Sequence, residues 1–175
     1  MDVFDLLLVG VEASIALAGF AGVIATYQIN NVTMIRRGPV GALTVIVQYS
    51  LMAALSCGIC LCLSAFGVLD KTLWAISSLI GTVFTIAGAY SIAKLMRGAI
   101  TKKSVRLLFL SLQSFGALVV LALILNALDL VFHREPGPFI AGIIYALGVA
   151  SYMFSRLLLL PLWRIVREQE AKIQQ

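Results

Sequence analysis

Five apolar stretches divide this 175-residue chain, and each is long enough to cross a membrane. A helix needs about 20 residues to span a hydrocarbon core of about 30 Å. A soluble domain could not cover the apolar faces of a chain that is 61% hydrophobic. The sequence therefore predicts an all-α, polytopic membrane bundle with five spans, at about 3–27, 41–68, 72–96, 106–132 and 138–160.

The basic residues give these spans an orientation. Lys71 and Arg134 fall in segments on one side of the membrane, and the other 11 of the 13 Lys and Arg residues fall on the opposite side. Those residues are Arg36, Arg37, Lys94, Arg97, Lys102, Lys103, Arg106, Arg156, Arg164, Arg167 and Lys172. Positive charge beside short loops stays in the cytoplasm. We therefore expect the N-terminus outside and the C-terminus inside, in a bacterial inner membrane.

The net charge of +5 does not indicate a nucleic-acid partner. In a soluble protein, such an excess of basic residues would suggest one. In a membrane protein, the positive-inside rule and anionic lipid headgroups already require basic residues where they occur in this chain. The partner that the charge indicates is the lipid bilayer.

The residues after the last span form a second expected unit. Arg164 and Glu168, and then Glu168 and Lys172, are four residues apart, a spacing that stabilises a helix. We expect a transmembrane domain over 1–160 and a short, amphipathic cytoplasmic helix over 161–175. This helix either flanks the membrane surface or binds a protein partner.

Glu12 is the most informative single residue, because it lies about ten residues into the first span and so near the bilayer midplane. A carboxylate at that depth costs about 2.5–3.5 kcal/mol and normally faces a bundle interior, a cavity or a partner. Asp5, Glu12, Gly19 and Thr26 repeat every seven residues, and we expect this stripe to be buried in protein. Two interpretations remain open: a carboxylate that handles protons or cations, and a protonated Glu that hydrogen-bonds a neighbouring helix.

Other spans carry weaker polar signals. Gln48 and Gln113 lie at similar depths in the second and fourth spans, where amide side chains usually hydrogen-bond between helices. Ser78, Thr82 and Thr85 share one face of the third span. That face predicts either a seam for close helix packing or the lining of a water path. The two glutamines and these three hydroxyl residues are therefore all candidates for a transport route.

Cys57-Gly58-Ile59-Cys60 is a CxxC motif inside the second span. In this motif the chain resembles membrane thiol oxidases such as the bacterial disulfide-bond quinone reductases and the vitamin K epoxide reductase type. The resemblance implies redox chemistry at Cys57 and Cys60, but those enzymes use a second cysteine pair, and this chain has one further cysteine, Cys62. Burial near mid-membrane makes thiols inert, which favours small packing residues instead.

The sequence holds no motif typical of a soluble enzyme. HExxH, a Walker loop, GxSxG and a dinucleotide fingerprint do not occur, and His133 is the one histidine. We therefore expect no enzyme activity, no metal site and no cofactor.

Three functions fit these observations. The first is a homo-oligomeric channel or pore for cations or protons, because symmetry turns one Glu12 per chain into a ring of acids. The second is a non-conducting assembly or accessory subunit that binds other membrane or cytoplasmic proteins. The third is a membrane thiol oxidoreductase that uses the CxxC motif.

Overall fold

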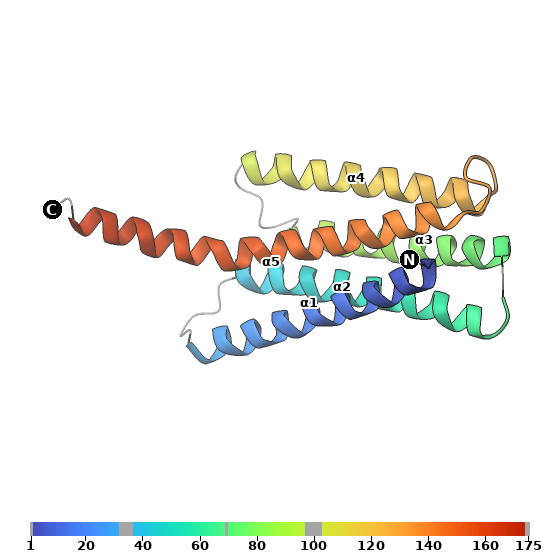
Figure 1. The fold of residues 1–175 in the computed structure, drawn as a ribbon. Coiled ribbons are helices and arrows are strands. Elements are labelled where there is room, and N and C mark those ends of the chain that lie inside the picture. Colours follow the sequence, from blue (N-terminus) through green and yellow to red (C-terminus); the bar gives the residue numbers. More distant parts are fainter. Residues whose placement is uncertain (1, 32–36, 69, 97–102, 174–175) are drawn as a thin grey trace.

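The computed structural model describes residues 2–31, 37–68, 70–96 and 103–173 (Figure 1). Within these ranges the chain forms helices and no strand, since in lipid each backbone amide must find its partner within the helix. The helices are α1 (Val3–Asn31), α2 (Arg37–Ala65), α3 (Asp70–Met96), α4 (Lys103–Ala127) and α5 (Pro136–Ile173). Each is long and apolar enough to cross a membrane, which confirms the predicted all-α chain with five such helices.

α5 is the central helix and packs against the other four. α1 packs on α2 and α5, while α4 packs on α3 and α5. In the described part of the chain, α1 and α4 do not touch each other. The first four helices therefore form an arc around α5, and α1 and α4 are the edges of that arc (Figure 1).

The helix ends gather at two ends of the bundle (Figure 1). The N-terminus lies at the same end as the α2–α3 turn and the α4–α5 loop. The C-terminal ends of α1 and α3 lie at the other end, where the last part of α5 projects past the bundle. This alternation agrees with five successive crossings.

α5 is longer than a membrane span requires. It has 38 residues, which corresponds to a length of about 57 Å. The segment expected as a separate C-terminal helix over 161–175 is helical as far as Ile173 and continuous with the last span through Pro161. The distinction between a transmembrane domain and a cytoplasmic helix stays a prediction.

Two helices end at residues with positive φ angles. Gly67 has a φ of 81°. Its N–H donates to the Ser64 carbonyl at 3.0 Å, and the Val68 N–H donates to the Leu63 carbonyl at 3.1 Å, as in a Schellman motif. Asp129 ends α4 in the same way, with a φ of 61°. For this reason α4 stops at Ala127, although the apolar run continues to 132.

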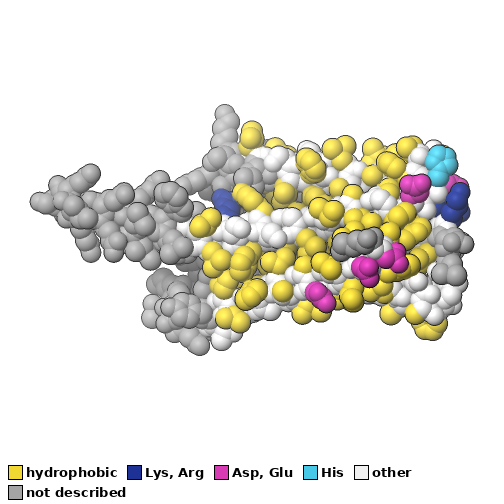
Figure 2. All heavy atoms as spheres, in the orientation of Figure 1, with side chains coloured by type: hydrophobic (Ala, Val, Ile, Leu, Met, Phe, Trp, Pro, Cys, Tyr) yellow, Lys and Arg dark blue, Asp and Glu magenta, His cyan; other side chains and the backbone are white. Residues whose placement is uncertain are grey.

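The outer surface of the bundle is apolar. Figure 2 shows hydrophobic side chains over the length of the visible face, with acidic side chains over α1. Large side chains such as Val23, Leu107 and Phe115 are 68%, 73% and 66% exposed. A surface of this kind suits lipid or a second protein, not water.

Two clusters of buried side chains fill the space around α5. One lies toward the end from which α5 projects and includes Tyr49, Ala150 and Met153. The other lies toward the N-terminal end of α1 and includes Cys57, Leu123 and Phe139. The apolar side chains of these clusters pack against one another between the helices and so gain dispersion contacts that hold the helices together.

Candidate functional site

The packing face of α1 consists of Leu7, Gly10, Ser14 and Ala21, all buried. A Cβ on Gly10 would lie 3.1 Å from the Cys57 sulfur, so α1 approaches α2 closely there. The Ser14 hydroxyl donates to the Gly10 carbonyl at 2.6 Å, which satisfies it within the helix. This face, and not the acidic one, joins α1 to the bundle.

Glu12 lies on the opposite face of α1. It is two residues, or about 200° of helix rotation, from both Gly10 and Ser14. Its side chain is exposed, and within the described part of the chain it has no hydrogen-bond or ion-pair partner. The carboxyl therefore points away from its own bundle, at about 14 Å from the start of α1.

The other residues of the stripe, which repeat every seven residues, face outward as Glu12 does. Asp5, Gly19 and Thr26 are exposed as well. A Cβ on Gly19 would meet nothing within 4 Å, and the Thr26 hydroxyl donates to the Gly22 carbonyl of its own helix at 3.0 Å. Within one protomer, the expectation that this stripe is buried in protein is wrong, because the Gly10 face fits the bundle instead.

Two of the candidate hydroxyl residues of α3 lie inside the bundle. Ser78 and Thr82 are buried, and Thr82 donates to the Ser78 carbonyl at 2.8 Å. Asn126 of α4, which is fully buried, donates from Nδ2 to the Ser78 hydroxyl at 2.9 Å. These contacts are those of a packing seam between α3 and α4.

Asn126 also holds the α4–α5 loop. Its Nδ2 donates to the Glu135 carbonyl at 2.9 Å, and its Oδ1 accepts from the Glu135 N–H at 3.0 Å. Gln113 makes a similar contact between helices, donating to the Ala89 carbonyl of α3 at 3.2 Å. Gln48 is half-buried on α2. The amides thus lie at different places in the fold and do not converge with Glu12.

A pair of tyrosines at the bundle centre was not expected from the sequence. The rings of Tyr49 and Tyr145 meet edge to face, with centroids 6.3 Å apart. Tyr49 packs on Gly88 of α3, and Tyr145 packs on Gly116 of α4. The sequence feature that could have indicated this pair is a glycine in each of the two facing helices, Gly88 in α3 and Gly116 in α4. Each tyrosine ring occupies the space that a side chain at that glycine would fill.

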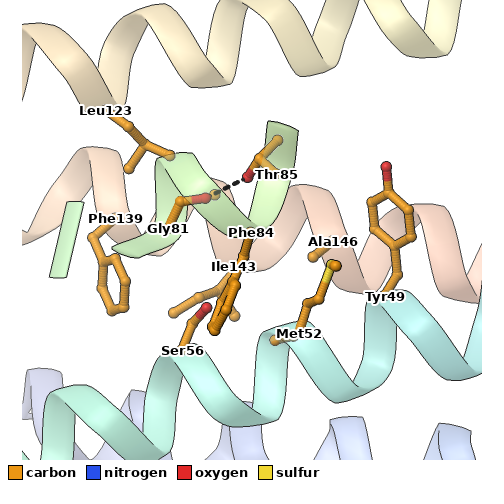
Figure 3. A pocket seen from close by; sticks show the side chains of 12 residues that line it. Tyr49, Met52, Ser56, Gly81, Phe84, Thr85, Leu123, Phe139, Ile143 and Ala146 are labelled. Atoms are coloured by element: carbon orange, nitrogen blue, oxygen red, sulfur yellow. Dashed lines mark hydrogen bonds between the residues drawn. The ribbon is translucent and has the colours of Figure 1, made fainter. Parts of the chain in front are cut away.

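A cavity of about 20 Å³ lies between α2, α3, α4 and α5. Figure 3 shows Ser56 and Met52 on one side of it and Thr85 on another, with the Thr85 hydroxyl bonded to the Gly81 carbonyl at 2.8 Å. One water molecule needs about 10–15 Å³ of such volume. This cavity therefore has room for about one water.

The CxxC pair is inside the bundle. Cys57 and Cys60 are fully buried free thiols, whereas Cys62 is exposed. A redox-active thiol needs access to its partner, which this burial does not provide. In the described ranges, no three His, Cys, Asp or Glu residues form a group that could hold a metal ion.

The candidate residues thus form two separate groups. Glu12, Asp5, Gly19 and Thr26 lie on the outward face of α1, while Ser78 and Thr82 lie within the α3 seam. The sequence matches no protein-family model and no curated protein, and the fold matches no solved structure.

Proposed function

We propose that this chain assembles into a symmetric homo-oligomer in the membrane and conducts cations or protons past a ring of Glu12 carboxyls. The observation that carries the proposal is the position of Glu12, exposed at mid-span on the face of α1 opposite its packing residues. Copies that meet around a rotation axis bring the same residue together at that axis. Rings of acidic side chains select cations in pores.

The free-energy cost of an exposed membrane carboxyl supports the assembly. Glu12 would face hydrocarbon in a lone protomer, at a cost of about 2.5–3.5 kcal/mol. Contact between α1 helices would replace this lipid with protein or with enclosed water. The open space at Gly19 allows a second backbone to approach closely on the same face.

A route between protomers agrees better with the geometry than a route through one. The cavity within the bundle holds about one water, at about 20 Å³, and Glu12 does not line it. The polar residues inside the bundle are largely occupied with hydrogen bonds between and within helices. Glu12 has no such partner in the described residues.

The orientation that we propose is an external N-terminus and a cytoplasmic C-terminus, in a bacterial inner membrane. Lys71 and Arg134 belong to the end of the bundle with the N-terminus, and Lys94 belongs to the other. A topology reporter fused after Gln175 should be cytoplasmic, and one inserted at 133–138 should be external. Reversal of either reporter would contradict this orientation.

The test of conduction uses purified protein in liposomes. Glu12→Gln keeps the size and hydrogen-bonding capacity of the side chain but removes its charge. Flux of protons or cations should fall, while the oligomer measured on the same preparation stays intact. Glu135→Gln is the matched control, because Glu135 is exposed at the end of the bundle, and its flux should equal that of the wild type. Unchanged flux in Glu12→Gln would disprove the charged site.

A second function, a non-conducting assembly subunit, is favoured by the length of α5. Its last part projects past the bundle, where it is available to a partner (Figure 1). In that case the wild-type protein should carry no flux in liposomes, and other proteins should co-purify with it. Removal of residues 162–175 should then release those proteins without unfolding the bundle.

A further inference from the structure

We propose that the ion carried past Glu12 is the proton, and that Na⁺ and K⁺ are excluded. This inference rests on the proposed function, since it requires the outward faces of α1 to line the route. The side chains that the outward face of α1 presents to an ion differ with depth in the membrane, and they decide which ion can pass.

The immediate neighbours of Glu12 on the outward face are apolar. Side chains three and four residues away on a helix surround a given residue. For Glu12 these are Leu8, Val9, Ile15 and Ala16, all exposed, with Leu8 and Ile15 at 53% and 62%. Each protomer therefore offers an ion at this depth one carboxyl group in apolar surroundings.

The stripe also lacks polar side chains between Glu12 and Thr26. Going inward, it presents Ala16, Gly19 and Val23 before Thr26, which is 14 residues from Glu12, or about 21 Å. A metal cation must exchange its water shell for several oxygen ligands or retain that shell. An apolar constriction that is too narrow for the water shell of a cation excludes that cation, because it offers no oxygen ligands in exchange.

A proton has no such requirement. A hydronium ion transfers a proton to a Glu12 carboxylate oxygen, so that one O–H bond of the hydronium breaks and one O–H bond to the carboxyl forms. The carboxyl then gives the proton to a water molecule on the other side, and no shell of oxygen ligands is needed. Protonation also neutralises the carboxyl, which removes the cost of a charge in apolar surroundings. Between Glu12 and Thr26, hydrogen-bonded waters would relay the proton from one water to the next, without passage of a hydrated cation.

The experiment measures ion selectivity of the wild-type protein in liposomes. Proton flux is followed with an enclosed pH dye, with the membrane potential set by valinomycin and K⁺. Currents are recorded separately in planar bilayers under opposed pH and KCl gradients. The reversal potential should follow the pH gradient and should not move with the KCl or NaCl gradient.

The outcomes separate this inference from the proposed function. A reversal potential that follows K⁺ or Na⁺ would overturn the proton assignment and leave the channel standing. Absence of any flux from an intact oligomer would overturn both. Proton flux that persists in Glu12→Gln would show that the proton does not pass through this carboxyl.

One variant tests the apolar stretch itself. Val23→Ser adds a hydroxyl where the stripe has none, and it should increase K⁺ flux relative to proton flux. Val83→Ser is the matched control, since Val83 is 63% exposed on α3 and Val23 is 68% exposed on α1. Equal K⁺ exclusion in both variants would contradict a barrier at Val23.

Discussion

The hydroxyl oxygen of Tyr145 lies 2.6 Å from the position that a Cβ would take on Gly116. The same hydroxyl donates to the Leu112 carbonyl of α4 at 3.2 Å. α4 and α5 can meet in this way only because residue 116 has no side chain. Tyr145 and Gly116 therefore set how closely an edge helix packs on the central one.

Replacement of Gly116 by Ala should lower the free energy of unfolding by about 1–3 kcal/mol, since the tyrosine would have to move in a packed interior. Unfolding of the purified protein in detergent measures this. Gly58→Ala is the control, because a Cβ there would meet nothing within 4 Å. An equal free energy of unfolding for the two variants would show that Tyr145 can move aside without destabilising the fold.

Asn126→Ala should also destabilise the bundle, because it leaves the polar groups of Ser78 and Glu135 without their partner. The expected loss is about 1–3 kcal/mol. Ser78→Ala should cost less, since Asn126 keeps both contacts to Glu135. A double-mutant cycle on Asn126 and Ser78 gives their coupling energy, and a coupling of zero would rule out an energetic role for the 2.9 Å contact.

Gly19→Leu should weaken the oligomer and leave the protomer folded, because the open space at Gly19 lies on the outward face. Cross-linking and sedimentation in detergent measure assembly, and circular dichroism measures the fold. Gly148→Leu serves as the control, since Gly148 is also exposed on its helix, α5, with nothing within 4 Å. Equal loss of oligomer in both variants would remove the evidence for a contact specific to Gly19.

A membrane-permeant thiol reagent should label Cys62 in the folded protein and leave Cys57 and Cys60 unmodified, because the latter two are fully buried. Mass spectrometry after digestion identifies the labelled sites, and all three should react after unfolding. Replacement of the three cysteines by Ala should preserve assembly and flux. Labelling of Cys57 or Cys60 in the intact bundle would revive the redox function.

The helices could be predicted from the sequence because apolar length is a local property of the chain. Each predicted span overlaps one helix, for example 72–96 with α3 (Asp70–Met96). The end of α4 could not be read in the same way. Asp129 adopts a positive φ that is unusual for a residue other than glycine, so the helix stops inside an apolar run.

The rotation of α1 is the part of the candidate site that could not be predicted. Both faces of α1 carry small residues, with Gly10 and Ser14 on one and Gly19 on the other. Helix periodicity identifies the two faces but does not decide which of them fits a neighbour. The close approach of Gly10 to Cys57 on α2 decides it, and that is a contact between distant parts of the chain.

The central position of α5 has a consequence for how the protein is made. Chains are synthesised from the N-terminus, so α1 to α4 are made before the helix that all of them contact. Until α5 arrives, Asn126 lacks its contacts to Glu135, and the glycine at 116 faces no tyrosine. The first four helices therefore lack these contacts until α5 is present, and the addition of α5 completes the packing of the bundle.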